Sequence, residues 1–184
     1  MRVYIKQRGR KYFIYQEDDN PPILTGYWAS NRKAGLHAVF FDNSEKEQLR
    51  VSVGKCPWIG GPTSYLIKTA ELPSEIEVEL KSRWKFDFQF SLDGDKYSYY
   101  GHNGHMKSLY RNDIQVAKFN KATFNWGERD SGYIIYNSDE NVKLLLGLWI
   151  MRDMGEINDA EISIDLGNLT SSAKVWNNNW FPTK

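Results

Sequence analysis

Apolar and polar residues alternate along much of this chain, and one stretch departs from that alternation. Residues 75–80 and 84–92 place every second side chain on an apolar face, which is the period of a half-buried strand. Between residues 141 and 151 the apolar side chains instead run on almost continuously: Leu144, Leu145, Leu146, Leu148, Trp149, Ile150 and Met151. A segment that is apolar on all sides must be enclosed on all sides. The pattern therefore predicts a β-rich fold organised around one buried segment.

The enclosed segment is predicted to be a helix over about Asp139–Arg152. Leucine and methionine dominate it, and the β-branched residues that favour strands are few. We expect Ser138 to be the N-cap, Asp139 and Glu140 to lie in the first turn, and Arg152 to follow the last turn. Spanning a bilayer takes about 20 apolar residues, and this stretch is shorter.

Short segments bounded by turn residues predict about a dozen strands. Those before the helix cover residues 3–7, 12–15, 23–28, 36–41, 49–53, 75–80, 84–92, 96–102, 105–111, 114–119, 121–126 and 133–136. Asp93-Gly94, Asn103-Gly104 and Asn112-Asp113 are expected to form two-residue hairpin turns. Residues 161–166 and 169–175 follow the helix as weaker strand candidates. The expected fold is mainly β, a closed antiparallel barrel of about twelve strands around the central hydrophobic helix, since closure removes exposed sheet edges.

Length and composition fit one domain over residues 1–184, with the barrel and helix in 1–153 and a C-terminal extension in 154–184. The net charge is only +1 at pH 7 and both signs are interspersed, which argues against nucleic acid as a partner. The first residues lack the hydrophobic core of a secretory signal. Cys56 has no second cysteine with which to form an internal disulfide. A cytoplasmic location is therefore expected.

Three stretches of the sequence carry a family likeness. The opening Tyr4-Ile-Lys-Gln7, followed by Phe13-Ile-Tyr-Gln-Glu17, resembles the start of the tubby-like proteins of the LURP-one-related family. Residues 110–118, Tyr-Arg-Asn-Asp-Ile-Gln-Val-Ala-Lys, are similar to the strand–turn–strand of that family. Residues 144–153, apolar and closed by an acidic residue, are similar to its core helix. The likeness covers residues 1–153 and contains no catalytic signature, and the chain departs from the family pattern after that point.

The resemblance implies a twelve-stranded barrel around a hydrophobic helix, related to the tubby C-terminal domain and the phospholipid scramblases. Some relatives bind phosphoinositides. The resemblance thus implies a non-catalytic module, without a cofactor, that binds anionic phospholipid headgroups at a membrane surface. Since one fold can host many functions, this expectation concerns the fold more than the function.

Two basic clusters are the candidate headgroup-binding residues. Lys6, Arg8, Arg10 and Lys11 gather around a turn, and Lys81, Arg83 and Lys85 alternate beside Trp84. Each basic residue near an anionic bilayer contributes about 1 kcal/mol to the free energy of membrane binding. The alternative interpretation of each cluster is a solvated charged rim.

His102 and His105 are a weak candidate metal site. If Asn103-Gly104 forms a two-residue turn, the two histidines face each other across neighbouring strands and can share an ion, with a third ligand coming from elsewhere. The alternative is a pair of exposed residues that flank a turn. Three other functions stay open: an enzyme with a site around these histidines, an intracellular protein-interaction scaffold that uses the C-terminal extension, and a small-molecule carrier. A carrier needs a hollow barrel, which the central helix should fill.

Overall fold

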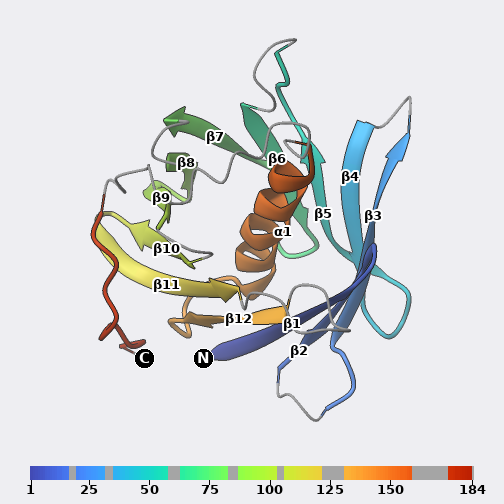
Figure 1. Cartoon of the computed structure of the whole chain (residues 1–184), viewed down its shortest axis with the longest axis horizontal. Helices are drawn as coiled ribbons and strands as arrows, with labels where there is room; N and C mark the ends of the chain where they lie inside the picture. The colour runs from blue at the N-terminus through green and yellow to red at the C-terminus, as the bar shows by residue number, and fades with distance from the viewer. Residues whose placement is uncertain are drawn as a thin grey trace.

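Twelve antiparallel strands close into a barrel around one helix, α1 (Val142–Asn158), in the computed structural model (Figure 1). The structure describes residues 1–16, 20–31, 35–57, 63–82, 87–102, 106–121, 131–158 and 174–183, and for Asn31 and 155–158 only the backbone. The strands are β1 (Arg2–Arg8), β2 (Lys11–Tyr15), β3 (Leu24–Asn31), β4 (Gly35–Phe41), β5 (Glu47–Val53), β6 (Ser64–Thr69), β7 (Ile76–Ser82), β8 (Asp87–Leu92), β9 (Asp95–Gly101), β10 (Met106–Arg111), β11 (Ile114–Lys121) and β12 (Ser131–Tyr136). Each strand pairs with its neighbour in sequence, and β1 pairs with β12 to close the barrel. The predicted fold class is confirmed.

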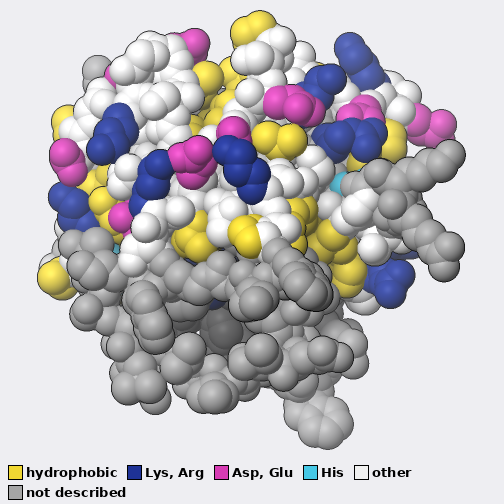
Figure 2. Space-filling view, turned by 90° about the horizontal axis from the view of Figure 1, so that it is seen from above, with side chains coloured by type: hydrophobic (Ala, Val, Ile, Leu, Met, Phe, Trp, Pro, Cys, Tyr) yellow, Lys and Arg dark blue, Asp and Glu magenta, His cyan; other side chains and the backbone are white. Residues whose placement is uncertain are grey.

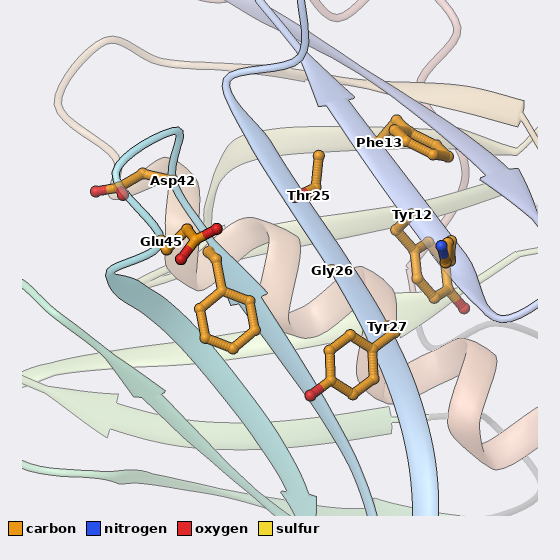
Figure 3. Close-up of a pocket in the computed structure, with 9 residues that line it drawn as sticks. Tyr12, Phe13, Thr25, Gly26, Tyr27, Asp42 and Glu45 are labelled. Atoms are coloured by element: carbon orange, nitrogen blue, oxygen red, sulfur yellow. The ribbon is translucent and has the colours of Figure 1, made fainter.

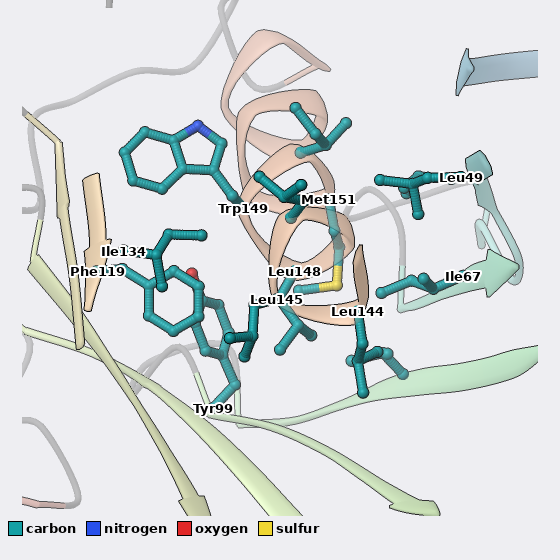
Figure 4. Close-up of a cluster of buried hydrophobic side chains, with 14 of the residues drawn as sticks. Leu49, Ile67, Tyr99, Phe119, Ile134, Leu144, Leu145, Leu148, Trp149 and Met151 are labelled. Carbon is teal, nitrogen blue, oxygen red and sulfur yellow. The ribbon is translucent and has the colours of Figure 1, made fainter. Parts of the chain in front are cut away.

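The helix fills the barrel because its side chains reach opposite walls. Figure 4 shows α1 between Leu49 of β5 and Ile67 of β6 on one side and Tyr99, Phe119 and Ile134 on the other. All seven apolar residues that predicted enclosure are buried, and Trp149, the most accessible, is only 4% exposed. The barrel interior is therefore a packed core.

One glycine lets the helix approach the wall closely. A Cβ atom on Gly147 would lie 2.6 Å from Cγ2 of Ile67, well inside van der Waals contact. The cost of about 1 kcal/mol that glycine imposes in a helix interior is thus offset by closer packing against β6.

The expected start and end of the helix are wrong. Asn141, rather than Ser138, is the N-cap, because its Oδ1 accepts hydrogen bonds from the backbone amides of Lys143 and Leu144. No acidic residue lies in the first turn. Arg152 lies within the helix, which continues to Asn158 and so passes the boundary expected at residue 153.

The residues expected to begin the helix instead bind a barrel strand. Arg111 of β10 forms ion pairs with Asp139 at 2.6 Å and with Glu140 at 3.2 Å. Burial raises the pKa of the Glu140 carboxyl, while the nearby Arg111 charge opposes that rise. These contacts hold the connection between β12 and α1 against β10.

Two of the predicted hairpin turns are confirmed. Asp93 and Gly94 have φ of 52° and 87°, and Asn112 and Asp113 have φ of 48° and 66°, so each pair forms the left-handed turn that two-residue hairpins favour. Strand β6 was not predicted, and the region expected to be a strand at 121–126 is described only at Lys121, which ends β11. The strand candidates at 161–166 and 169–175 lie outside the described residues, apart from Lys174 and Val175, which are not in a strand.

Candidate functional site

The β1–β2 hairpin brings the first basic cluster together on the outside of the barrel. Gly9, with φ of 60°, and Arg10 form the turn between the strands. Arg8 pairs with Lys11 and Lys6 pairs with Phe13, so these side chains share the outer face. Inward-pointing Val3, Ile5 and Gln7 alternate with them and are buried. The sequence alternation therefore places the cationic groups in solvent.

Aromatic rings lie beneath these cations. The Lys6 ammonium lies 5.1 Å from the ring centroid of Tyr15, and the guanidinium carbons of Arg8 and Arg10 lie 6.0 and 5.2 Å from those of Phe13 and Trp28. Arg2, also on β1, lies 4.9 Å from the ring centroid of Tyr133. Cations within about 6 Å of a ring centroid are attracted to the ring face. We call the outer-face residues Arg2, Lys6, Arg8, Arg10, Lys11, Phe13, Tyr15 and Tyr133 the basic-aromatic face.

A groove of about 550 Å³ adjoins the basic-aromatic face on strands β2, β3 and β4. Thr25 and Tyr27 project from β3 between Phe13 of β2 and Glu45 of the β4–β5 turn (Figure 3). Its other outward-facing lining residues are Lys11, Phe41 and Asp42. Tyr27 is 46% exposed, a large value for an aromatic side chain in a sheet.

The second basic cluster is not a concentration of positive charge in the described structure. Lys81 hydrogen-bonds to Glu79 on the same strand, and Lys55 forms an ion pair with Glu77 at 3.0 Å. Basic and acidic side chains likewise lie next to one another across the described part of the face shown in Figure 2. Arg83 and Lys85 lie outside the described residues. The structure thus places a carboxylate beside the one described member of this cluster.

His102 is buried. Its backbone amide donates to the carbonyl of Met106, and Gly101 pairs with Lys107, whereas the predicted two-residue turn required His102 to pair with His105. Asn103, Gly104 and His105 lie outside the described residues. Nε2 of His102 lies 2.6 Å from Oγ of Ser108 in a hydrogen bond, and its ring packs edge-on against Trp176. No group of three metal-ligating side chains occurs among the described residues.

The environment of His102 makes stability dependent on pH. Burial, reinforced by the charge of Lys107, lowers the pKa of His102 from 6.5 to about 4. Between pH 6.5 and pH 4 His102 binds a proton in the unfolded chain but not in the folded chain. Its contribution to the free energy of unfolding is therefore fully present above about pH 6.5 and is lost as the pH falls toward 4. We expect the free energy of unfolding to fall by about 2 kcal/mol more between pH 7 and pH 4.5 in the wild type than in His102→Gln, in urea titrations. Equal losses in the two proteins would contradict this assignment.

The C-terminal residues dock on the outside of the barrel. Trp176 lies against His102, Lys118 of β11 donates to the carbonyl of Asn178, and the Thr183 amide donates to Asn137. Lys174 forms an ion pair with Asp113 at 3.2 Å. Residues 174–183 therefore cover part of β10 and β11.

A small cavity lies inside the barrel beside α1. A cavity of about 10 Å³ lies at the C-terminal part of α1, between Trp149, Asp153 and Lys121. Asp153 accepts a hydrogen bond from Tyr12 and forms an ion pair with Lys121 at 3.0 Å. A volume of this size holds about one water molecule. This cavity is thus too small for the guest of a carrier protein.

The groove residues were missed by the sequence analysis. Phe13, Thr25, Tyr27 and Phe41 come from three strands, and only the pairing register brings them together. The available signal was the alternation around Gly26, which places Thr25 and Tyr27 on the solvent side of β3.

None of the helices in the described part of the chain is long and apolar enough to cross a membrane. Comparisons with models of protein families, with curated proteins and with solved structures found no match to this chain.

Proposed function

We propose that this chain is a non-catalytic, tubby-like barrel module that binds anionic phospholipid headgroups at a membrane surface through its basic-aromatic face. The observation that carries the proposal is the placement of three cationic side chains, those of Arg2, Lys6 and Arg8, over aromatic rings on the outside of one hairpin and its neighbour β12. Tyrosine and tryptophan are favoured at membrane interfaces because one end of the ring system is apolar and the other is polar.

Charge at this face supports an anionic partner. Among the described residues, no carboxylate forms an ion pair with Arg2, Arg10 or Lys11. The rings beneath the cations limit the conformations of long side chains, which lowers the entropy lost when a phosphate binds. The packed interior favours binding at the outer surface over transport inside the barrel.

The tubby-like kinship is part of the same proposal. Twelve strands closed around a hydrophobic helix agree with the architecture that the sequence resemblance implies. We propose a cytoplasmic location, where an exposed single thiol such as Cys56 stays reduced. A partner that binds residues 154–184 is compatible with this function.

Vesicle sedimentation tests the proposal. We expect the protein to sediment with phosphatidylcholine vesicles that contain a phosphoinositide, at low salt, and to be released as salt screens the charges. Arg8→Gln/Arg10→Gln is expected to weaken this binding about tenfold or more, because each basic residue contributes about 1 kcal/mol.

The matched control removes the same charge elsewhere. Lys68→Gln/Lys96→Gln replaces two exposed lysines on β6 and β9 and should reduce binding by less than about threefold. Equal weakening by the two double variants would mean that only net charge matters. That result, or no sedimentation at any phosphoinositide content, contradicts the proposal.

A further inference from the structure

The groove on β2, β3 and β4 is built from two rows of outward-facing side chains. Lys11 lies opposite Tyr27, and Phe13 lies opposite Thr25, which in turn lies opposite Phe41. Neighbouring strands are about 4.8 Å apart, so the side chains at the two edges of the groove start about 10 Å apart. A small ligand of several heavy atoms can therefore contact all three strands at once.

One part of the groove presents aromatic ring faces. The rings of Tyr27 and Phe41 stack with centroids 6.3 Å apart and an interplanar angle of 23°. Phe13 adds a third ring at the β2 edge. Tyr27 is exposed and Phe41 is half-buried. Two roughly parallel rings that solvent can reach suit an organic cation, because the ring face carries partial negative charge and a quaternary ammonium loses little hydration.

The two edges of the groove carry opposite charge. Lys11 belongs to β2 and lines the groove at that edge. The carboxylates of Asp42 and Glu45 lie at the β4–β5 turn (Figure 3). Asp42 accepts hydrogen bonds from the amides of Ser44 and Lys46 and from Gln48, and the bond from Lys46 is the main cause that holds its pKa below the usual value. Glu45 is exposed and forms no ion pair with another described residue.

We propose that the groove binds a zwitterion of the phosphocholine type. Lys11 and the Thr25 hydroxyl take the phosphate, and the quaternary ammonium lies on the Tyr27 and Phe41 rings next to Glu45. A simple anion is disfavoured because Asp42 and Glu45 repel it, and a simple cation gains nothing from Lys11. The groove volume of about 550 Å³ lies within the ordinary range for small-molecule sites.

This site shares Lys11 and Phe13 with the basic-aromatic face, but it does not include the arginines of that face. The zwitterion contacts strands β2 to β4 and the β4–β5 turn, whereas Arg8 and Arg10 do not line the groove. Arg8→Gln/Arg10→Gln is therefore expected to bind phosphocholine as the wild type does, even though it loses binding to phosphoinositide vesicles.

Titration of the full chain with soluble phosphocholine, followed by amide chemical shifts of β3 and the β4–β5 turn, tests the proposal. We expect phosphocholine to bind at least about tenfold more tightly than choline or inorganic phosphate, because it engages both edges. Tyr27→Leu and Glu45→Gln should each raise the dissociation constant about fivefold, the scale of one exposed cation–ring contact. Both residues are exposed, so the variants should keep the wild-type melting temperature.

Tyr15→Leu is the matched control, since it removes a ring from the same outer face of β2 outside the groove, and it should bind as the wild type does. Equal affinity for phosphocholine and inorganic phosphate would overturn the proposal, as would an unchanged affinity in Tyr27→Leu. The absence of shifts up to about 50 mM phosphocholine would also overturn it. Vesicles of pure phosphatidylcholine distinguish the two sources of this headgroup. If the protein sediments with these vesicles, the ligand is a lipid. If it binds soluble phosphocholine but does not sediment, the ligand is a free phosphate ester.

Discussion

Replacing Gly147 by valine is expected to lower the free energy of unfolding by about 3 kcal/mol, the upper range for overpacking a dense core. The new Cβ would lie 2.6 Å from Cγ2 of Ile67, and Ile67 is fully buried among other core side chains. Valine has a higher helix propensity than glycine, so the expected loss of stability is entirely steric. Urea denaturation of the two proteins measures the difference.

A compensating variant separates steric conflict from other causes. Ile67→Ala removes three carbons opposite the helix and should itself cost about 2–5 kcal/mol through the cavity that it leaves. Gly147→Val/Ile67→Ala refills that space, so its cost should be at least about 1 kcal/mol smaller than the sum of the single variants. Strict additivity would contradict the close approach of α1 to β6.

Asp153→Asn is expected to destabilise the protein by about 3 kcal/mol, because it leaves the largely buried Lys121 side chain without its carboxylate partner on α1. The side chains of Lys121 and Asp153 are only 13% and 5% exposed. The same change also weakens the hydrogen bond that Tyr12 of β2 donates to this carboxylate. The substitution therefore weakens the contacts of α1 with both β11 and β2. The midpoint of thermal unfolding should fall as well.

Asp139→Asn provides the matched control for this ion pair. It removes one of the carboxylates that Arg111 contacts, but the Asp139 side chain is 57% exposed. Exposed ion pairs contribute about 0–1 kcal/mol, so this variant should remain close to the wild type. A loss as large as that of Asp153→Asn would contradict the distinction between the interior and surface pairs.

The barrel and its central helix were predictable because their signals are local. Alternation over residues 75–80 and 87–92 fixes which side chains face inward, and Ile76, Val78, Phe88 and Phe90 are indeed buried. The continuous apolar run that ends at Met151 is enclosed as its composition required. Both inferences depend only on the spacing of residues within one element.

Features that depend on neighbouring elements were missed. Strand β6 has half-buried Leu66 between buried Tyr65 and Ile67, so its alternation is hidden in an apolar run. Asp139 and Glu140 bind Arg111, a residue about thirty positions earlier in the chain, and the helix begins after them with Asn141 as its N-cap. The capping propensity of Ser138 contains no information about this contact with a distant strand.

The candidate site was predicted in part for the same reason. The hairpin of residues 2–15 is a local feature, so the gathering of Lys6, Arg8, Arg10 and Lys11 follows from the sequence. The groove requires the register of β2 on β3 and of β3 on β4, which places Phe13, Thr25 and Phe41 in one row. No spacing within a single strand contains that information.

Native-state hydrogen exchange of the amides of residues 145–150 tests the central claim most directly, namely that α1 fills the barrel. A helix enclosed on all sides can exchange only when the whole barrel opens, so these amides should report the same free energy as global unfolding in urea. Exchange at a free energy about 2 kcal/mol or more below the global value, while the strand amides remain protected, would contradict a packed barrel.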